Sequence, residues 1–392
     1  MNFLQPLIFV SLTLAWPVAN AQAAVSGESV NVSSEEETSA SFQAHPEAEI
    51  SFGSTSNATQ LTQPTPGTFA KITPNLSLEW TPSDSFFSSL TVGGTIKRYT
   101  DSQVGSLADQ TGVSAKSDST WYLREHWEIG TNLSFNYLKN SIPVVSLQSV
   151  SAIPQQYYEP DARLYTAWIG DNWAFEGGFS GATRRYDTTT FDIQGNVYRN
   201  TYNTYKFDGK IGYRFSQNLR LALKSSIERR YYQERMAEFT DGLPVFPGTT
   251  NPLLQVLTQE HEVQLKSKVS SISLTTGVSA KYEKDEIFAA RDSLQFRLRQ
   301  KASIPLPLRL SLDPEVSISR QGFFNFRSDP MLDPQASPLR TDWETQISSA
   351  LSYPLTQLFK VHALYAYNRR ISNYSLQNYL EHIFEAGMNV QF

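Results

Sequence analysis

Apolar and polar side chains alternate with a period of two residues through most of this chain of 392 residues. The pattern is clearest in segment 379–392, where one face is apolar: Phe384, Ala386, Met388, Val390 and Phe392. The other face of that segment is polar: Glu381, Glu385, Asn389 and Gln391. Because successive side chains of a β-strand point to opposite faces, this pattern predicts a strand with one side in an apolar environment and the other in water.

The connections between the alternating segments differ in length. Short turns are predicted at 82–84, 130–132, 170–172, 216–218, 269–270, 305–307 and 356–357. Longer polar connections are predicted at about 55–67, 101–117, 142–159, 188–198, 234–257 and 324–339. Short turns that alternate with long loops are typical of a transmembrane β-barrel whose turns lie on the periplasmic side.

About sixteen strands follow from this pattern. Their predicted ranges are 40–53, 68–81, 86–99, 118–129, 132–141, 161–170, 173–186, 200–215, 218–232, 259–269, 271–284, 291–304, 308–320, 341–354, 359–371 and 379–392. Alternation is least clear in 118–141, where Glu125 would face lipid, and in 161–170, so fourteen strands are an alternative.

The overall composition averages over the two faces of the predicted strands, one apolar and one polar. Hydrophobic residues make up 40% of the chain and charged residues 18%, with a net charge of -5 and a mean hydropathy of -0.36. The absence of cysteine excludes a disulfide framework, a thiolate nucleophile and a cysteine-ligated metal. After the first two dozen residues there is no long apolar run of the kind that forms a transmembrane helix.

Closure of the predicted sheet follows from energetics. In lipid, an open sheet edge would leave backbone N–H and C=O groups without partners, so the sheet must close on itself. The expected fold is therefore all-β, a single antiparallel up-and-down transmembrane barrel. A soluble β-sandwich is the competing interpretation, but it does not account for an apolar face that continues to the last residue, Phe392.

The N-terminal region predicts export. Residues 1–21 combine an apolar stretch with the small-residue pattern Ala19-Asn20-Ala21, which is typical of a secretory signal peptide. Residues 22–38 are rich in Ser and Glu and predict a disordered acidic linker in the periplasm. The barrel is then expected over 39–392.

Together, the signal peptide, the alternating cysteine-free body and the closing strand resemble Gram-negative outer-membrane β-barrel proteins, with a porin-like architecture. The terminal Phe392 is similar to the signal that the barrel assembly machinery reads. The closing hairpin from Tyr365 onward is weakly similar to barrels of lipoprotein-display and exopolysaccharide-secretion proteins. The resemblance implies a location in the cell outer membrane, in contact with outer-membrane lipid and lipopolysaccharide.

Assigning the polar face of each strand to the interior predicts a charged, water-filled lumen. The predicted basic lining residues are Lys206, Lys210, Arg214, Arg220, Lys224, Lys266, Lys268, Arg297, Arg299 and Lys301. The predicted acidic lining residues are Glu47, Glu49, Glu79, Asp313, Glu315, Asp342, Glu344, Glu381 and Glu385. Opposed arcs of the two signs would create a transverse field that discriminates solutes by charge. The alternative is that the charges pair across strands and rigidify the wall.

Arginines also recur beside tyrosines where strands leave the membrane. By the alternation, Arg98, Arg185, Arg229 and Arg369 point outward at the rim. A guanidinium fork suits the phosphates of lipopolysaccharide. The alternative is an ordinary interfacial girdle of Tyr and Arg side chains.

Signals for chemistry are nearly absent from the sequence. The five histidines lie singly on separate strands, and no metal-ligand spacing or phosphate-binding glycine loop occurs. We therefore expect no catalytic residues, no metal, no cofactor and no nucleic-acid partner, and no enzymatic activity.

The expected function is passive diffusion of small polar or charged solutes through the lumen. One alternative is a non-conducting surface or structural barrel whose loops bind partners, with the lumen plugged by the loop 234–257 or by charge pairs. Another is an export barrel for polysaccharide or lipoprotein.

Overall fold

The computed structural model describes residues 41–60, 64–124, 126–145, 150–187, 190–191, 197–237, 252–290, 292–327, 338–373 and 378–392. The predicted signal peptide and linker (1–38) lie outside these residues, as do Glu125 and most of the predicted loop 234–257. Among the described helices, none is long and apolar enough to span a membrane.

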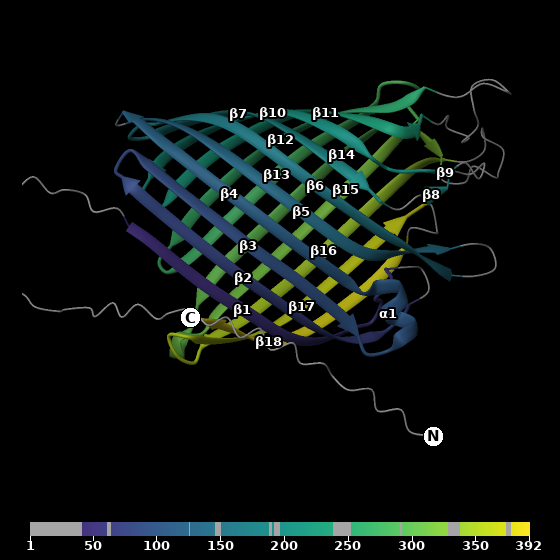
Figure 1. The fold of residues 1–392 in the computed structure, drawn as a ribbon, viewed down its shortest axis with the longest axis horizontal. Helices are drawn as coiled ribbons and strands as arrows, with labels where there is room; N and C mark the ends of the chain where they lie inside the picture. The colour runs from purple at the N-terminus through teal and green to yellow at the C-terminus, as the bar shows by residue number, and fades with distance from the viewer. Residues whose placement is uncertain are drawn as a thin grey trace, which may run out of the picture. The chain divides into compact units, whose positions relative to one another are not determined.

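Sixteen antiparallel strands form one closed barrel, in which β1 pairs with β18 (Figure 1). The barrel strands are β1 (Ser41–Thr55), β2 (Gly67–Ser83), β3 (Phe86–Tyr99), β4 (Gln110–Arg124), β5 (Trp127–Val145), β6 (Val150–Ile169), β7 (Trp173–Tyr186), β10 (Tyr202–Ser216), β11 (Leu219–Met236), β12 (Leu253–Val269), β13 (Ile272–Asp285), β14 (Ser293–Pro305), β15 (Ser311–Arg327), β16 (Leu339–Pro354), β17 (Phe359–Ser372) and β18 (Tyr379–Gln391). This confirms the expected fold class and the expected number of strands.

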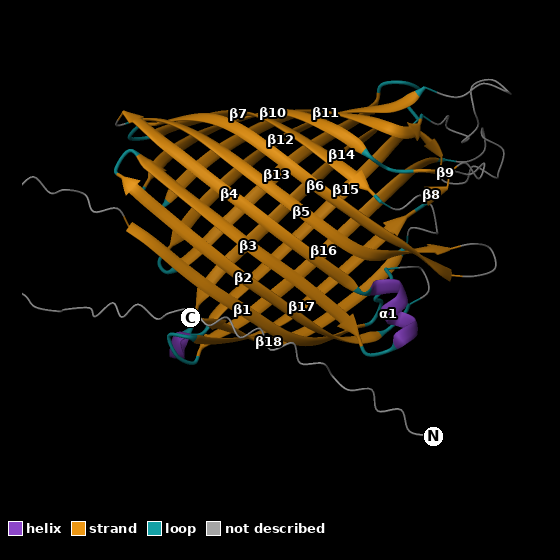
Figure 2. Cartoon of the chain, in the orientation of Figure 1, coloured by secondary structure: helices purple, strands orange, loops and turns teal. Residues whose placement is uncertain are grey.

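Small additional elements lie in the connections. Helix α1 (Ser102–Ala108) follows β3, and strands β8 (Thr190–Phe191) and β9 (Val197–Tyr198) form a separate two-stranded ribbon between β7 and β10. A single 3-10 turn, Pro307–Arg309, precedes β15. Figure 2 shows that strands dominate the barrel and that helical structure is confined to its ends.

The two ends of the barrel differ, as predicted. At one end, which we call the turn end, the connections between strands are two to five residues long. At the other, the loop end, they are four to sixteen residues long and include α1. Both the start of β1 and Phe392 lie at the turn end, since an even number of strands returns the chain to its starting side.

Three predicted boundaries in the first half of the barrel are wrong. The predicted turn 130–132 lies inside β5, since β4 ends at Arg124 and β5 already begins at Trp127. The predicted loops 101–117 and 142–159 are largely strand, because β4 begins at 110, β5 continues to 145 and β6 begins at 150. Residues 110–120 are mostly small and polar on both faces, so alternation does not mark them. They form a strand because their backbones pair with β3 and β5.

Gly130 has a packing role inside β5 and does not form a turn. It lies opposite Tyr165 of β6, and a Cβ atom at position 130 would stand 2.2 Å from Cζ of that ring. The Tyr165 hydroxyl lies 3.0 Å from Oγ1 of Thr120 in β4, which holds the ring across the glycine. The glycine therefore serves close side-chain packing rather than a turn.

Replacing Gly130 with Val should lower the free energy of unfolding by about 1–3 kcal/mol, because the Tyr165 ring must rotate away from Thr120. Gly177→Val is the matched control, since a Cβ at Gly177 meets nothing within 4 Å. Urea unfolding of both variants in detergent checks this. Equal midpoints for the two valine variants would contradict the packing role of Gly130.

The outer face of the barrel is apolar. Phe52, Phe207 and Phe296 are more than half exposed, as expected for side chains that contact lipid rather than a protein core. Aromatic pairs gather near the turn end of this face, for example Phe86 with Trp121, whose ring centroids are 5.0 Å apart, and Trp173 with Tyr213, at 4.6 Å. Such clusters match the aromatic girdles of transmembrane barrels.

A buried carboxylate pair organises the connection between β13 and β14 at the loop end. The backbone N–H of Asp285 donates to Oδ1 of Asp292 over 2.8 Å, and the N–H of Ile287 donates to Oδ1 of Asp285 over 3.0 Å. Burial raises the pKa of the Asp292 carboxyl. These bonds satisfy backbone groups that would otherwise be unpaired in a tight connection.

Candidate functional site: the charged lumen

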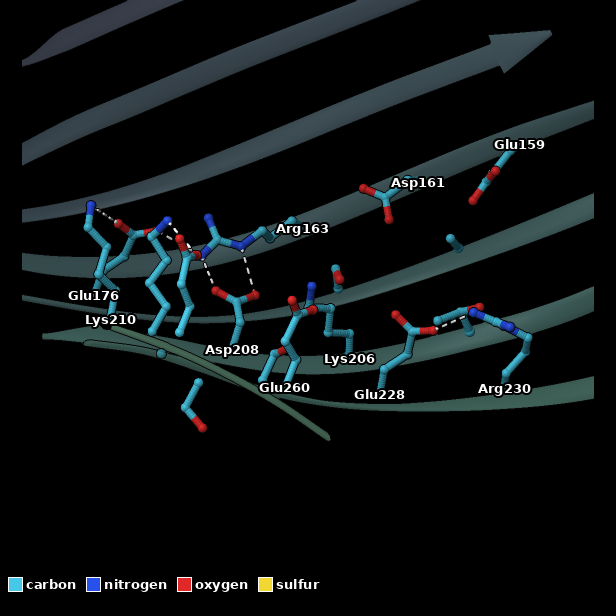
Figure 3. Close-up of a pocket in the computed structure, with 18 of the residues that line it drawn as sticks. Glu159, Asp161, Arg163, Glu176, Lys206, Asp208, Lys210, Glu228, Arg230 and Glu260 are labelled. Atoms are coloured by element: carbon cyan, nitrogen blue, oxygen red, sulfur yellow. Dashed lines mark hydrogen bonds and ion pairs between the residues drawn. The ribbon is translucent and has the colours of Figure 1, made fainter. Parts of the chain in front are cut away.

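A cavity of about 750 Å³ lies inside the barrel against five neighbouring strands, β6, β7, β10, β11 and β12 (Figure 3). Alternate residues of each strand point into it, so the side chains come from one face of the sheet. Its charged lining comprises Glu159, Asp161, Arg163, Glu176, Arg184, Lys206, Asp208, Lys210, Lys224, Glu228, Arg230, Glu260 and Glu262.

Arg163 of β6 lines this cavity and is hydrogen-bonded to side chains of three other strands, β5, β7 and β10. Its guanidinium donates to Oε1 of Glu176 over 2.8 Å and to both carboxylate oxygens of Asp208, with an Nε to Oδ1 distance of 3.1 Å. A further bond of 3.3 Å reaches Oδ1 of Asn132. A Cβ at Gly178 would lie 2.8 Å from the guanidinium, so the glycine leaves room for it. Figure 3 shows Arg163 directed at Asp208. Such fork-like contacts hold an arginine in one geometry.

Other ion pairs run between neighbouring strands of the same wall. Lys224 Nζ lies 3.0 Å from Glu262 Oε2, and Lys210 Nζ lies 3.6 Å from Glu176 Oε2. The Lys210 side chain is 48% exposed and that of Lys224 39% exposed, although both point to the inside of a closed sheet. The wall is therefore in contact with a wide interior space, and its charges are not sealed in a packed core.

Strand register places all ten predicted basic lining residues on the polar inner face of the barrel. Their environments differ. Lys210, Lys224 and Arg299 form ion pairs, with 2.8 Å between Arg299 Nε and Glu315 Oε1. Arg214 donates to the backbone oxygen of Asp171. Among the described residues, the other six have no ion pair: Lys206, Arg220, Lys266, Lys268, Arg297 and Lys301.

The predicted acidic lining residues are mostly bonded. Asp342 pairs with Arg340 at 2.6 Å and Glu344 with Arg370 at 3.6 Å. Glu47 accepts a hydrogen bond from Asn389. Glu381 accepts hydrogen bonds from Thr55, Gln60 and Asn368, whereas Glu79 and Asp313 have no ion pair within the described part of the chain.

The expected separation of the two signs is incomplete. Glu176, Asp208, Glu228, Glu260 and Glu262 stand within the predicted basic arc and interrupt it. These acids lie on the same inner face as the lysines and arginines of the same strands. Pairing across strands therefore accounts for part of the charge, and unpaired cations remain between the pairs.

At the barrel closure, Lys71 of β2 lies between two carboxylates. Its Nζ is 3.1 Å from Glu49 Oε1 and 2.6 Å from Glu385 Oε1, and the Ser51 hydroxyl also donates to Glu385 over 2.7 Å. The side chain of Glu385 is 8% exposed. These contacts join β2, β1 and β18, whose pairing closes the barrel.

His362 joins this cluster, which sequence reasoning missed. One donor atom each from Glu49, His362 and Glu385 lie within 4.8 Å of one another, a spacing that can hold a metal ion. The Lys71 ammonium already contacts both carboxylates, so a divalent cation would have to displace it. The three residues are brought together by strand closure and not by any spacing visible in the sequence.

A serine and a histidine also meet across β11 and β12. The Ser225 hydroxyl lies 3.0 Å from Nδ1 of His261, and the two residues are direct cross-strand partners. Both are on the face opposite to Lys224 and Glu262, which is the outer face. Their backbone N–H groups lie in the strand ladder and so are not grouped as an oxyanion hole.

The four predicted rim arginines lie on the outer face near the loop end. Arg229 Nε is 2.6 Å from Glu286 Oε2, and Arg98 Nη1 is 3.7 Å from Asp109 Oδ2. Arg185 and Arg369 are exposed and have neither an ion pair nor a side-chain hydrogen bond to the described residues. Phe392 is 75% exposed, and its backbone N–H donates to the oxygen of Pro46 over 3.0 Å.

Comparisons with known proteins concern the fold. No family model and no curated protein sequence matches the chain. Among solved structures, it is similar to an anion-selective porin from Comamonas acidovorans, with 10% identity, a TM-score of 0.48, and coverage of 90% of this chain and 100% of that chain. It is also similar to the copper transporter OprC, with 12% identity and a TM-score of 0.47 over 86% of this chain, which corresponds to 62% of the length of that transporter. A bacterial polysaccharide outer membrane secretin matches with 11% identity and a TM-score of 0.43, over 88% of this chain and 98% of that chain. The closed sixteen-strand topology is that of an outer-membrane β-barrel.

Proposed function

We propose that this barrel is an outer-membrane channel through which small polar or charged solutes diffuse passively. The observation that carries the proposal is the exposure of charged side chains on the inner face. Lys210 is 48% exposed and Arg299 58% exposed, even though each is already ion-paired. Removing a charged side chain from water costs so much free energy that a dry interior would not hold this many charges. This favours a water-filled lumen.

The dimensions of the barrel support the same proposal. Sixteen strands enclose a space wide enough for an aqueous channel. Outside the barrel strands, the described residues comprise turns, a seven-residue helix and a short ribbon. A helix of that length is only about 10 Å long, which is too short to fill such a lumen.

Enzymatic activity is not part of the proposal. The described Ser225–His261 pair faces the lipid side and has no oxyanion donors grouped beside it. The lumen contains many carboxylates, and two of them, Glu176 and Asp208, are held by Arg163. Charges fixed in this way can orient a passing solute by electrostatics.

Contacts with lipopolysaccharide are proposed for Arg185 and Arg369. Both are exposed at the outer rim without an ion pair to the described residues, so their guanidinium groups are available to phosphate. Arg98 and Arg229 already have acidic neighbours, so we propose that they contribute less to lipopolysaccharide binding. We also keep the proposal that Phe392 contributes to recognition by the barrel assembly machinery.

A liposome-swelling assay tests the proposed function. Vesicles that contain the folded barrel should swell in solutions of arabinose, glucose and raffinose, with rates that fall as the sugar becomes larger, because diffusion through a pore of fixed width is sieved by size. Vesicles with heat-denatured protein are the control. A folded barrel that gives no swelling with any sugar would support a non-conducting surface or structural role instead.

A further inference from the structure

A second, smaller cavity opens in the lumen near the turn end, next to the 170–172 turn. It has a volume of about 270 Å³ and is separate from the large cavity, although Lys210 borders both. Its floor is a row of small or apolar residues brought side by side by strand pairing: Ala174 pairs with Gly212, and Gly212 pairs with Ala222. Ile169 and Gln264 lie at the two ends of this row.

The next row toward the turn end is cationic. Arg214 is the direct cross-strand partner of Arg220, and Arg220 is the partner of Lys266. All three line the small cavity. Like charges placed directly opposite each other on a sheet destabilise it.

No described acid forms an ion pair with this row, although Asp171 also lines the cavity. Within the described chain, Arg220 and Lys266 have no ion pair, and Arg214 donates to a backbone oxygen of Asp171. The row on the other side of the floor differs, since there Lys210 and Lys224 face Glu176 and Glu262. The cavity therefore lies between a paired row and an unpaired cationic row.

We propose that this cavity is a binding site for a small organic anion, a carboxylate on a compact apolar body. The carboxylate would lie against Arg220 and Lys266, because a guanidinium fork and an ammonium suit its two oxygens. The apolar body would lie on Ala174, Gly212 and Ala222. A bound anion would offset the repulsion within the cationic row.

The proposal rests on the proposed function in one respect, since the ligand must reach the cavity through a water-filled lumen. It goes further by naming a discrete site and a class of solute. A channel that only filters charge through its overall field would treat all anions of one size alike.

Benzoate is a suitable probe, and calorimetric titration into the detergent-solubilised full-length barrel at low ionic strength is the test. Benzoate should bind, whereas benzyl alcohol, which has the same ring without the charge, should not. Inorganic phosphate should bind more weakly than benzoate, because it has no apolar part to cover the floor. Phosphate binding as tight as that of benzoate would overturn the proposed ligand class.

Three variants locate the site. Arg220→Gln should weaken benzoate binding by about tenfold, the loss of one charge-assisted contact. Gly212→Leu should abolish binding by filling the cavity, since a Cβ at position 212 has no contact closer than 3.8 Å and causes no clash. Lys268→Gln is the matched control, because Lys268 lies on the same face of β12 two residues nearer the turn end and does not line the cavity.

Equal weakening by Arg220→Gln and Lys268→Gln would overturn the proposal, because it would show a diffuse field and no discrete site. Arg220 is exposed, so its variant remains informative if Gly212→Leu does not fold. A barrel that binds benzoate in solution but gives no liposome swelling would refute the channel and leave the site. A barrel that swells liposomes but does not bind benzoate would refute the binding site and leave the channel.

Discussion

Replacing Lys71 with methionine is expected to lower the free energy of unfolding by about 2–4 kcal/mol, somewhat below the cost of breaking a fully buried ion pair. The substitution keeps most of the side-chain volume but removes the ammonium that lies within 3.1 Å of Glu49 and 2.6 Å of Glu385. Two carboxylates are then left side by side, one of them only 8% exposed. Because they belong to the strands that close the barrel, the loss falls on the β1–β18 seam.

The control for this prediction is Lys116→Met. Lys116 also has an acidic partner at 2.6 Å, Asp118, but its side chain is 59% exposed, so its loss should change stability by less than about 0.5 kcal/mol. Combining Lys71→Met with Glu385→Gln should restore part of the lost stability. Urea unfolding followed by the gel mobility of the heat-sensitive folded form measures all three. Equal effects of the two lysine substitutions would show that the seam cluster has no special role.

Arg163→Gln is expected to make the channel more selective for cations. The substitution removes the positive charge that is paired with Glu176 and Asp208, while the glutamine amide keeps a hydrogen-bond donor in place. The energy between one unit charge and a monovalent ion about 8 Å away in water is about 0.5 kcal/mol, with opposite signs for a cation and an anion. Removing the charge therefore shifts the ratio of cation to anion permeability by about 1 kcal/mol, which is roughly fivefold. The reversal potential across a bilayer in a KCl gradient reports this ratio.

Arg185→Gln is the control for the selectivity change. It removes the same charge from the outer face of the barrel, where ions in the lumen are shielded from it. Its reversal potential should match that of the unmodified protein. A shift of equal size in both variants, or no shift in Arg163→Gln, would contradict the assignment of Arg163 to the lining of the conducting path.

The sequence predicts every strand in the second half of the barrel because the outward residues there are large, although β12 begins at residue 253 rather than 259 and β15 continues to 327 rather than 320. In β18, Phe384, Met388 and Val390 alternate with polar partners, and the observed strand, Tyr379–Gln391, matches the expected range 379–392 closely. In β4 the outward positions are occupied by residues such as Ala115 and Ser117, so hydrophobic contrast is lost. The strand exists because of hydrogen bonding to its neighbours, which is a property of register and not of local sequence.

The candidate site shows the same difference between what local sequence predicts and what only strand register determines. Alternation predicts that Lys210, Arg220 and Lys266 share the inner face, and the register agrees. Alternation does not predict that Arg163 lies between Glu176 and Asp208, since that contact depends on how three neighbouring strands are aligned. The row Ala174–Gly212–Ala222 is likewise visible only once three strands are aligned.

Single-channel recording in a planar lipid bilayer tests the central claim most directly. The folded barrel, inserted at low protein concentration in KCl, is expected to produce stable stepwise openings with a linear current–voltage relation, as a permanently water-filled lumen requires. The reversal potential in a salt gradient should then shift with Arg163→Gln and stay unchanged with Arg185→Gln. A barrel that inserts and is fully folded by its gel mobility, yet passes no current over a wide voltage range, would contradict the claim that its lumen is an open path for solutes.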